Sequence, residues 1–356
     1  LGIPALSTEE ALHGFMAKGA TAFPQAIALA STWDPSLVER VFTAAALEAR
    51  ARGANWVLTP VLDIARDPRW GRTEETLGED PFLVSCLGVA AVHGLQGRGA
   101  DIGKDRVLAT AKHFAAHGQP EGGTNAAPVN LSERILREQL FPPYEAAVRE
   151  ARVATVMASY NEIDGIPSHV NRWLLDDVLR GEWGFSGLVC SDGGGIGDLV
   201  GRHHVAADIA DAARQALAAG IDIELDGTFG GIAADARAGR VDIARIDEAV
   251  ARVLRAKLAV GLFVDPYVDP ERAERVTNSP AHRALALEAA RKAIVLLKNE
   301  PLEGRGPVLP IERARLKTIA VIGPNAAVVH TGGYTYDPAP GVSVLDGVRR
   351  KLGDTV

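Results

Sequence analysis

The feature that most constrains this chain is an alternation of short apolar runs with longer amphipathic segments over its first 260 residues. The runs are continuously apolar, as expected for parallel strands that are covered on both faces. This order predicts an α/β fold, and about 250 residues is the usual size of a (β/α)8 TIM-like barrel. The predicted strands are 56–62, 107–113, 153–160, 187–192 and 220–225, with shorter candidates at 3–6 and 26–31.

Capping residues and apolar stripes predict helices between these strands. Asp34-Pro35 and Asp80-Pro81 each place a capping residue before a first-turn proline, and Asn171 can cap the segment that follows it. Apolar stripes at helical spacing run through 209–217 and 243–258. Only about seven strands can be counted for a barrel of eight, so we expect that a first strand and helix are missing from this chain.

The same patterns predict three parts of the chain. Residues 1–260 are expected to form the TIM-like barrel that carries the chemistry. Residues 261–280 hold three prolines among polar residues without a sustained period, which predicts a linker. Residues 281–356 are expected to begin a second α/β domain, with a helix over 282–298 and a buried strand over 317–322; we expect this domain to be incomplete here.

Composition excludes several classes of protein. The 38 basic residues against 45 acidic ones leave a net charge of −7, which argues against nucleic acid as a partner. Apolar stretches are interrupted well short of the ~18 residues that indicate a membrane span. Cys86 and Cys190 are the only cysteines, so no disulfide framework is expected. The sequence leaves open the compartment and whether the protein is a homo-oligomer.

Polar side chains follow the predicted strands at their carboxyl ends, where parallel barrels place their chemistry. Asp192 ends one strand, Lys112 and His113 end another, and Tyr160 ends a third. Other charged residues near such ends are Glu9, Glu10, His13, Asp63, Arg66, Arg69, Arg72, Glu74, Glu75, Glu79, Glu224 and Asp226. This ring of cations, carboxylates and hydroxyl donors suits a polyhydroxylated sugar.

Asp192 is the candidate nucleophile. We expect it to stay ionised, because neighbouring Lys and Arg charges lower the pKa of a carboxyl group. An ionised, partly desolvated carboxylate suits attack on an anomeric carbon. Asp192 could instead cap a helix, and the charged residues at 66–80 could form a solvated loop network. Lys112 could form a Schiff base, as lysines do in barrel aldolases.

The histidines offer a further alternative. His113 and His117 have the spacing of zinc ligands on a helix, but Phe114 stands where the metalloprotease pattern requires Glu, which argues against zinc. His203 and His204 are expected at the surface.

Several linear motifs resemble glycoside hydrolase family 3. They are Glu9-Glu10-Ala11-Leu12-His13-Gly14, Ala65-Arg66-Asp67-Pro68-Arg69-Trp70-Gly71-Arg72, Ala111-Lys112-His113-Phe114, Ser159-Tyr160-Asn161, Ser191-Asp192, Leu296-Leu297-Lys298-Asn299 and Ala320-Val321-Ile322-Gly323-Pro324. Together they extend over nearly the whole chain. The resemblance implies a retaining β-glycosidase built from a barrel and an α/β sandwich domain, and it implies neither a metal nor an organic cofactor.

The resemblance also implies roles for individual residues. Asp192 would be the nucleophile, and Tyr160 would lie beside it. Sugar hydroxyls would be bound by Arg72, Lys112 and His113, and Glu10 stands where many members carry an Asp that holds the outer hydroxyls. The general acid/base would be a Glu of the second domain, which we expect outside this chain.

Three departures from the family pattern bear on the substrate. Gly193 replaces the Trp or Tyr that usually follows the nucleophile. No further His occurs in the loop 118–125, which argues against an N-acetylhexosaminidase. Glu10 is one methylene longer than Asp and would crowd the hydroxymethyl group of a hexose. We therefore expect a β-xylosidase, with β-glucosidase as the alternative, acting on small oligosaccharides or on aryl and alkyl β-glycosides. A sugar-binding relative without activity and a Schiff-base lyase using Lys112 are the distant alternatives.

Overall fold

The computed structural model describes residues 2–99, 101–301, 304, 306–336 and 341–353. Its centre is a series of short parallel strands, β1 (Thr8–Glu9), β2 (Trp56–Val57), β3 (Thr110–Phe114), β4 (Thr155–Ala158) and β7 (Leu188–Cys190). Strand β1 pairs with β2, and β3, β4 and β7 form one sheet in that order. Single bridges join Trp56 to Leu108 and Cys190 to Ile223. The described bridges therefore form an open arc of parallel strands in chain order, which confirms the α/β class.

The predicted strands at 56–62, 107–113, 153–160 and 187–192 are confirmed, although each is shorter than predicted. The prediction over 220–225 is reduced to the bridge at Ile223. Residues 3–6 form no strand; pairing begins two residues later, at β1. The prediction over 26–31 is wrong, because these residues form helix α1 (Ala26–Ala30). A short apolar run does not distinguish a strand from a buried helix, and its alanines favour the helix.

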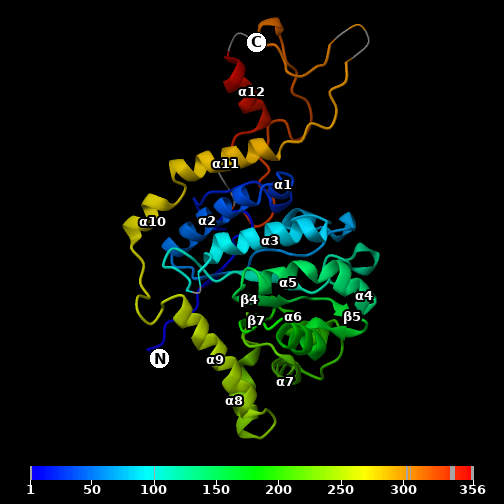
Figure 1. Cartoon of the computed structure of the whole chain (residues 1–356), viewed down its shortest axis with the longest axis vertical. Helices are drawn as coiled ribbons and strands as arrows, with labels where there is room; N and C mark the ends of the chain where they lie inside the picture. The colour runs from blue at the N-terminus through cyan, green and yellow to red at the C-terminus, as the bar shows by residue number, and fades with distance from the viewer. Residues whose placement is uncertain (1, 100, 302–303, 305, 337–340, 354–356) are drawn as a thin grey trace.

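Two long helices begin at the predicted caps. Asp34 accepts a hydrogen bond from the backbone N–H of Leu37 at 3.0 Å and starts α2 (Pro35–Ala51). Asp80 does the same for Leu83 at 2.8 Å and starts α3 (Pro81–Gln96). A cap of this kind typically contributes about 1 kcal/mol. Helices α2 and α3 lie side by side, and α5 (Pro142–Arg149) packs against α3 (Figure 1).

The other elements connect this framework. They are α4 (Glu133–Ile135), the π-helical segments Leu136–Leu140 and Trp173–Glu182, hairpin strands β5 (Glu162–Ile163) and β6 (Ile166–Pro167), α6 (Gly195–Gly201), α7 (Ile209–Ala219), α8 (Ile232–Arg237), α9 (Ile243–Ala259), α10 (Pro270–Val276), α11 (Pro280–Ala293), α12 (Val344–Leu352), and short 3-10 helices. Within the described residues, no helix is long and apolar enough to cross a membrane.

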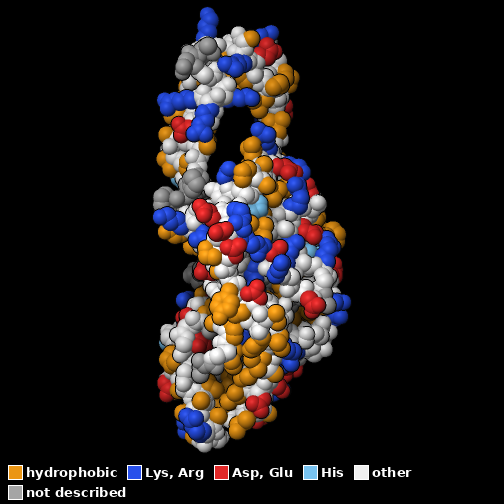
Figure 2. Space-filling view, turned by 90° about the vertical axis from the view of Figure 1, so that its left-hand side faces the viewer, with side chains coloured by type: hydrophobic (Ala, Val, Ile, Leu, Met, Phe, Trp, Pro, Cys, Tyr) orange, Lys and Arg blue, Asp and Glu red, His pale blue; other side chains and the backbone are white. Residues whose placement is uncertain are grey.

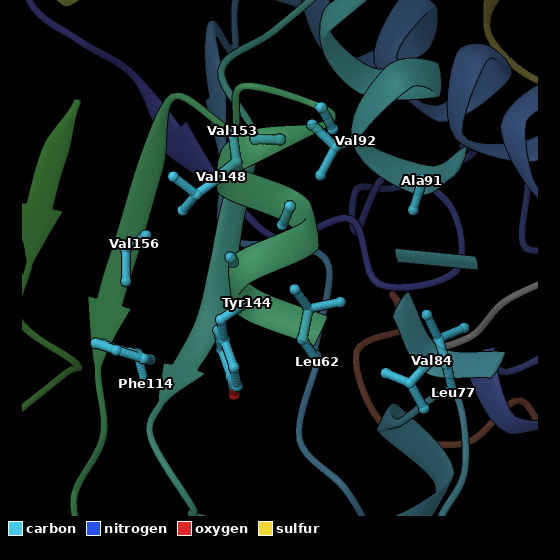
Figure 3. Close-up of a cluster of buried hydrophobic side chains, with 14 of the residues drawn as sticks. Leu62, Leu77, Val84, Ala91, Val92, Phe114, Tyr144, Val148, Val153 and Val156 are labelled. Carbon is cyan, nitrogen blue, oxygen red and sulfur yellow. The ribbon is translucent and has the colours of Figure 1, made fainter. Parts of the chain in front are cut away.

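The core lies between the strands and the helices α2, α3 and α5. Figure 3 shows part of it, where Phe114 and Val156 of the strands lie near Tyr144 and Val148 of α5. The rings of Phe114 and Tyr144 are 5.2 Å apart. Phe114 is fully buried and anchors the carboxyl end of β3, which positions the residues just before it.

The stripe predicted over 243–258 faces the core only in part. Ala249 and Ala256 of α9 are buried, whereas Ile243 and Leu258 are each 61% exposed. Figure 2 views the side of the molecule that carries α9, and hydrophobic side chains gather over the lower half of the molecule in this view. A helical period identifies one face of a helix, but it does not show that the whole face is covered.

The later residues depart most from the expectations. Residues 261–280 contain helix α10, which packs against α2, and α11 packs against α1 and α2 and ends at Ala293, before the predicted end at 298 (Figure 1). The predicted buried strand over 317–322 is wrong. The structure describes those residues, gives them no strand, and leaves Ile322 89% exposed. A strand needs hydrogen-bonded neighbours, and 306–336 contains no other strand for it to pair with.

Candidate active site

Asp192 follows β7, and the surrounding residues hold its two carboxylate oxygens differently. Oδ1 accepts hydrogen bonds from the Tyr160 hydroxyl at 2.9 Å and from the backbone N–H of Gly193 at 2.8 Å. The backbone N–H of Asp192 donates to Nε2 of His169 at 3.1 Å. Oδ2 is buried and accepts no hydrogen bond from any residue that the structure describes. The carboxylate is thus oriented through one oxygen, and the other, 3.6 Å from Nε2 of His113, accepts no hydrogen bond.

Burial controls the protonation of Asp192. It raises the pKa of this carboxyl group, while Lys112, the hydrogen bonds from Gly193 and Tyr160, and Arg72 act in the opposite direction. The expectation that neighbouring cations would set a low pKa is therefore wrong in its net direction. The ionised carboxylate loses more solvation free energy on burial than it gains from its attraction to the cations.

His113 lies beside Asp192 and has a fixed tautomer. Its Nδ1 is 2.7 Å from Oδ2 of Asp63. Asp63 is buried, and its Oδ1 accepts a hydrogen bond from the Tyr144 hydroxyl at 3.1 Å. This places the ring proton on Nδ1 and leaves Nε2 as an acceptor. Arg72 donates to that Nε2 at 3.1 Å. Burial, assisted by Arg72 and Lys112, lowers the pKa of His113 well below its usual value, so the ring is neutral.

Arg72 is held rigidly. Its Nε and Nη2 donate to the two carboxylate oxygens of Glu75, each at 2.8 Å, and its Nη1 donates to Nε2 of His117 at 3.0 Å. With the bond to His113, four of the five guanidinium N–H groups are directed at these partners, which leaves one on Nη1. A bidentate ion pair of this kind fixes both position and orientation.

Lys112 and Glu10 form an ion pair at the same end of the strands. The ammonium group of Lys112 is 2.9 and 3.1 Å from the two oxygens of Glu10. Burial raises the pKa of Glu10, although Lys112 opposes this shift. Side chains normally alternate along a strand, but the register of β3 shifts between Ala111 and Phe114. This irregularity lets the consecutive Lys112 and His113 both reach the site.

The structure brings together the six residues to which the family resemblance gives a role, but not every charged residue predicted near a strand end. They form one contiguous cluster: Glu10, Arg72, Lys112, His113, Tyr160 and Asp192. The prediction that His203 lies at the surface is wrong. Its side chain is 5% exposed, and its ring contacts Glu162 at 3.1 Å and the carbonyl of Tyr160 at 2.9 Å. His204 is exposed, as predicted.

Two residues that contact the site, Tyr334 and His169, were not predicted from the sequence. Tyr334 lies 5.2 Å from the ammonium of Lys112, measured to the ring centre. Its neighbours hold it there, because His13 contacts the carbonyl of Gly333 at 2.9 Å and the hydroxyl of Thr335 at 3.0 Å. His169 supports Asp192 from behind and follows a predicted strand by several residues. Across the described part of the chain, no three His, Cys, Asp or Glu side chains are grouped so that they could hold a metal ion.

Comparisons with known proteins identify a family. Residues 1–256 match the model of the glycosyl hydrolase family 3 N terminal domain. A beta-xylosidase of Formosa agariphila is 41% identical over the whole chain, which covers 52% of that relative. A periplasmic beta-glucosidase of Salmonella typhimurium is 37% identical over 99% of the chain and 46% of its own length.

Solved structures give the same result. The structure of a β-glucosidase from Erythrobacter marinus matches 99% of the chain and 47% of its own, with 43% identity and a TM-score of 0.95. The chain therefore spans about half the length of the relatives it matches.

Proposed function

Because the chain belongs to glycosyl hydrolase family 3, we propose that its protein is a retaining, exo-acting β-glycosidase. Its main activity is β-xylosidase, with β-glucosidase as the alternative. The parallel arc is part of a (β/α)8 TIM-like barrel over 1–260, and 281–356 begin an α/β sandwich domain. The observation that carries the proposal is the pair of unlike oxygens on Asp192, one held by hydrogen bonds from Tyr160 and Gly193 and the other accepting none.

In the first step, Oδ2 of Asp192 attacks the anomeric carbon of the terminal sugar. The bond from that carbon to the glycosidic oxygen breaks, and the leaving oxygen takes a proton from a general acid. Oδ1 becomes the carbonyl oxygen of the ester and keeps its hydrogen bonds from Tyr160 and Gly193. No residue of this chain is assigned as the general acid.

In the second step, water attacks the same carbon. The ester bond breaks, its electron pair returns to Asp192, and the proton of the water passes to the group that acted as acid before. The configuration at the anomeric carbon is inverted twice and therefore retained. Since burial raises the pKa of Asp192, the ionised nucleophile is depleted as the pH falls, and activity has an acid limb.

The terminal sugar is bound by the Glu10–Lys112 pair and by the remaining N–H of Arg72, and it contacts the neutral ring of His113, whose two nitrogens are already hydrogen-bonded. Their positions are fixed before the substrate arrives, because each is held by an ion pair or a buried hydrogen bond. Preorganised groups of this kind hold the hydroxyls in place while the ring flattens, and the Asp192 carboxylate stabilises the positive charge that develops at the anomeric carbon. The ion pair also argues against a Schiff-base lyase, because an ammonium held by a carboxylate is not the free amine that such chemistry requires.

The comparisons support both sugars, since the relatives and neighbours include xylosidases and glucosidases. The length of the Glu10 side chain favours the pentose. Lys112 holds the Glu10 carboxylate by two contacts, and in the proposed pose the hydroxymethyl group of a hexose would collide with this carboxylate. We therefore expect a higher kcat/KM for 4-nitrophenyl β-xyloside than for 4-nitrophenyl β-glucoside.

The test is Asp192→Asn in the protein as its gene encodes it. Turnover of both aryl glycosides should fall by about 10³-fold or more, as happens when a nucleophile is removed. Folding should persist, because a buried carboxylate with a raised pKa is exchanged for a neutral group of the same shape. Asp247→Asn is the matched control, since Asp247 is exposed on α9. Near-normal turnover by Asp192→Asn would refute the proposal.

A further inference from the structure

His203 is a buried polar residue to which the mechanism above gives no role. The chain leaves the nucleophile at Asp192, runs through helix α6 and reaches His203 two residues after that helix ends at Gly201. The backbone N–H of His203 donates to the carbonyl of Asp198 at 2.8 Å, which ties it to α6. Its side chain is only 5% exposed. A buried imidazole needs partners for both ring nitrogens, and those partners define its charge.

Both partners of the His203 ring are hydrogen-bond acceptors. Nδ1 lies 3.1 Å from a carboxylate oxygen of Glu162, and Nε2 lies 2.9 Å from the backbone carbonyl oxygen of Tyr160. A neutral imidazole has one N–H and donates to only one of them. The two contacts are made together only by the imidazolium form, which has a proton on each nitrogen. His203 is therefore the cation of an ion pair with Glu162.

Tyr160 connects this ion pair to the nucleophile. Its hydroxyl is 2.9 Å from Oδ1 of Asp192 and 2.7 Å from the carbonyl of Gly193, while its own carbonyl accepts from His203. Asp192 and His203 thus stand at the two ends of one short segment, and both contact Tyr160. These contacts close a ring, in which a shift of the His203 side chain would move Tyr160 relative to the carboxylate.

We propose that the Glu162–His203 pair is a positioning element for the nucleophile. The imidazolium of His203 holds the Tyr160 carbonyl, and through Tyr160 it fixes the hydroxyl that orients Asp192. The inference rests on the proposed function, because that function assigns Asp192 to the reaction. His203 acts through Tyr160 rather than on the reacting atoms, so its loss should affect the chemical step more than the binding of the sugar.

The positioning depends on pH, because it requires the doubly protonated ring. When one proton is lost, the Glu162 carboxylate is the stronger acceptor and keeps the remaining proton on Nδ1. Nε2 then directs a lone pair at the Tyr160 carbonyl, and that contact is lost. The activity of the unmodified protein should therefore decrease toward alkaline pH.

Other titratable groups near His203 do not obscure this change. Burial, assisted by the charge of His203, lowers the pKa of His169 to about 3, so the His169 ring stays neutral. Arg202 and Asp198 of the same segment form an ion pair at 3.0 Å and keep their charges. His204 is exposed, and its Nδ1 lies 3.0 Å from the carbonyl of Val200, away from Tyr160.

The test uses two substitutions that retain different ends of the imidazole, in the protein as its gene encodes it. The amide nitrogen of Gln takes the place of Nε2 and keeps the donor to the Tyr160 carbonyl, whereas that of the shorter Asn takes the place of Nδ1 and keeps the donor to Glu162. At pH 6, His203→Gln should retain kcat/KM for 2,4-dinitrophenyl β-xyloside within about 3-fold, because the positioning contact remains. His203→Asn should lower it about 10-fold or more, mainly in kcat, because a displacement of ~1 Å can cost ~100-fold.

The pH profile separates positioning from a merely structural role. The 2,4-dinitrophenyl leaving group needs little help from an acid, so loss of the general acid's proton at high pH has little effect on this substrate. The unmodified protein should lose kcat/KM from pH 6 to 9, whereas His203→Gln should stay level. His204→Asn is the matched control and should follow the unmodified protein, and urea unfolding shows whether each variant is folded.

Glu162→Gln gives a second test that leaves the ring in place. The amide of this variant donates to Nδ1, so a neutral His203 keeps its proton on Nε2 and its contact with Tyr160. This variant should also stay level from pH 6 to 9. Equal effects of Gln and Asn at position 203, or an alkaline decrease that persists in both Gln variants, would overturn the positioning role. Absence of turnover of any β-glycoside by the unmodified protein would instead overturn the proposed function, and this role with it.

Discussion

Replacing Tyr160 by Phe tests how the protein tunes its nucleophile. The change removes one hydroxyl group, which is 2.9 Å from Oδ1 of Asp192 and 2.7 Å from the carbonyl of Gly193. The hydroxyl has a single proton and donates it to one oxygen at a time. When Asp192 is ionised, the carboxylate is the stronger acceptor, so the bond is charge-assisted.

The magnitude follows from this bond. A hydrogen bond to a charged group is worth about 1.5–3 kcal/mol. One pKa unit corresponds to 1.36 kcal/mol, so losing the bond raises the pKa of Asp192 by about 1–2 units, and by less where the protonated acid also keeps a contact with the hydroxyl. The sign is unambiguous, because the Tyr160 hydrogen bond lowers the pKa that burial has raised. The acid limb of activity should therefore move to higher pH.

The assay is kcat/KM for 4-nitrophenyl β-xyloside from pH 4 to 8, since this quantity reports the ionisation of the free enzyme. Tyr267→Phe is the control, because Tyr267 is 86% exposed. The acid limb of Tyr160→Phe should lie about one unit above that of the unmodified protein, while the control should coincide with it. A limb that stays in place or moves to lower pH would refute this reasoning.

Two further predictions concern buried residues near the site. Asp63→Asn removes the carboxylate that holds the His113 ring. In a steady-state assay, kcat/KM for both aryl glycosides should fall by about 10–100-fold, as is typical for orienting partners; an unchanged kcat/KM would contradict this role. Burial lowers the pKa of His169 to about 3, so its contribution to stability is present above the unfolded value near 6.5 and is lost as the pH falls. From pH 6.5 to 5.5 the unmodified protein should lose about 1.0 kcal/mol more than His169→Gln does in urea unfolding; identical pH dependence of the two would contradict this.

The sequence is most informative where parallel strands end. Asp192, Lys112 and Tyr160 follow three continuous apolar runs, and parallel strands share one carboxyl edge, so their proximity follows from the order of elements alone. The capped starts of α2 and α3 are equally local, because Asp34 and Asp80 act on residues three positions away.

The remaining features depend on packing between distant parts of the chain. Tyr334 reaches Lys112 from far along the sequence, and nothing in the residues around it shows this contact. The pKa of Asp192 depends on how deeply the carboxyl group is buried, which neighbouring charges in a motif do not reveal. The run at 26–31 is apolar enough for a strand or a helix, and its packing against α11 is visible only in the folded molecule.

The most direct test of the central claim is to trap the covalent intermediate. The protein would be incubated with the 2,4-dinitrophenyl 2-deoxy-2-fluoro-β-glycosides of xylose and glucose, whose leaving groups need little help from an acid, and the site of added mass would be located by peptide mapping. We expect one sugar per protein, attached to Asp192, with the xyloside reacting faster. A label on another carboxylate, or no label on folded protein that hydrolyses β-glycosides, would contradict the assignment of Asp192 as the nucleophile.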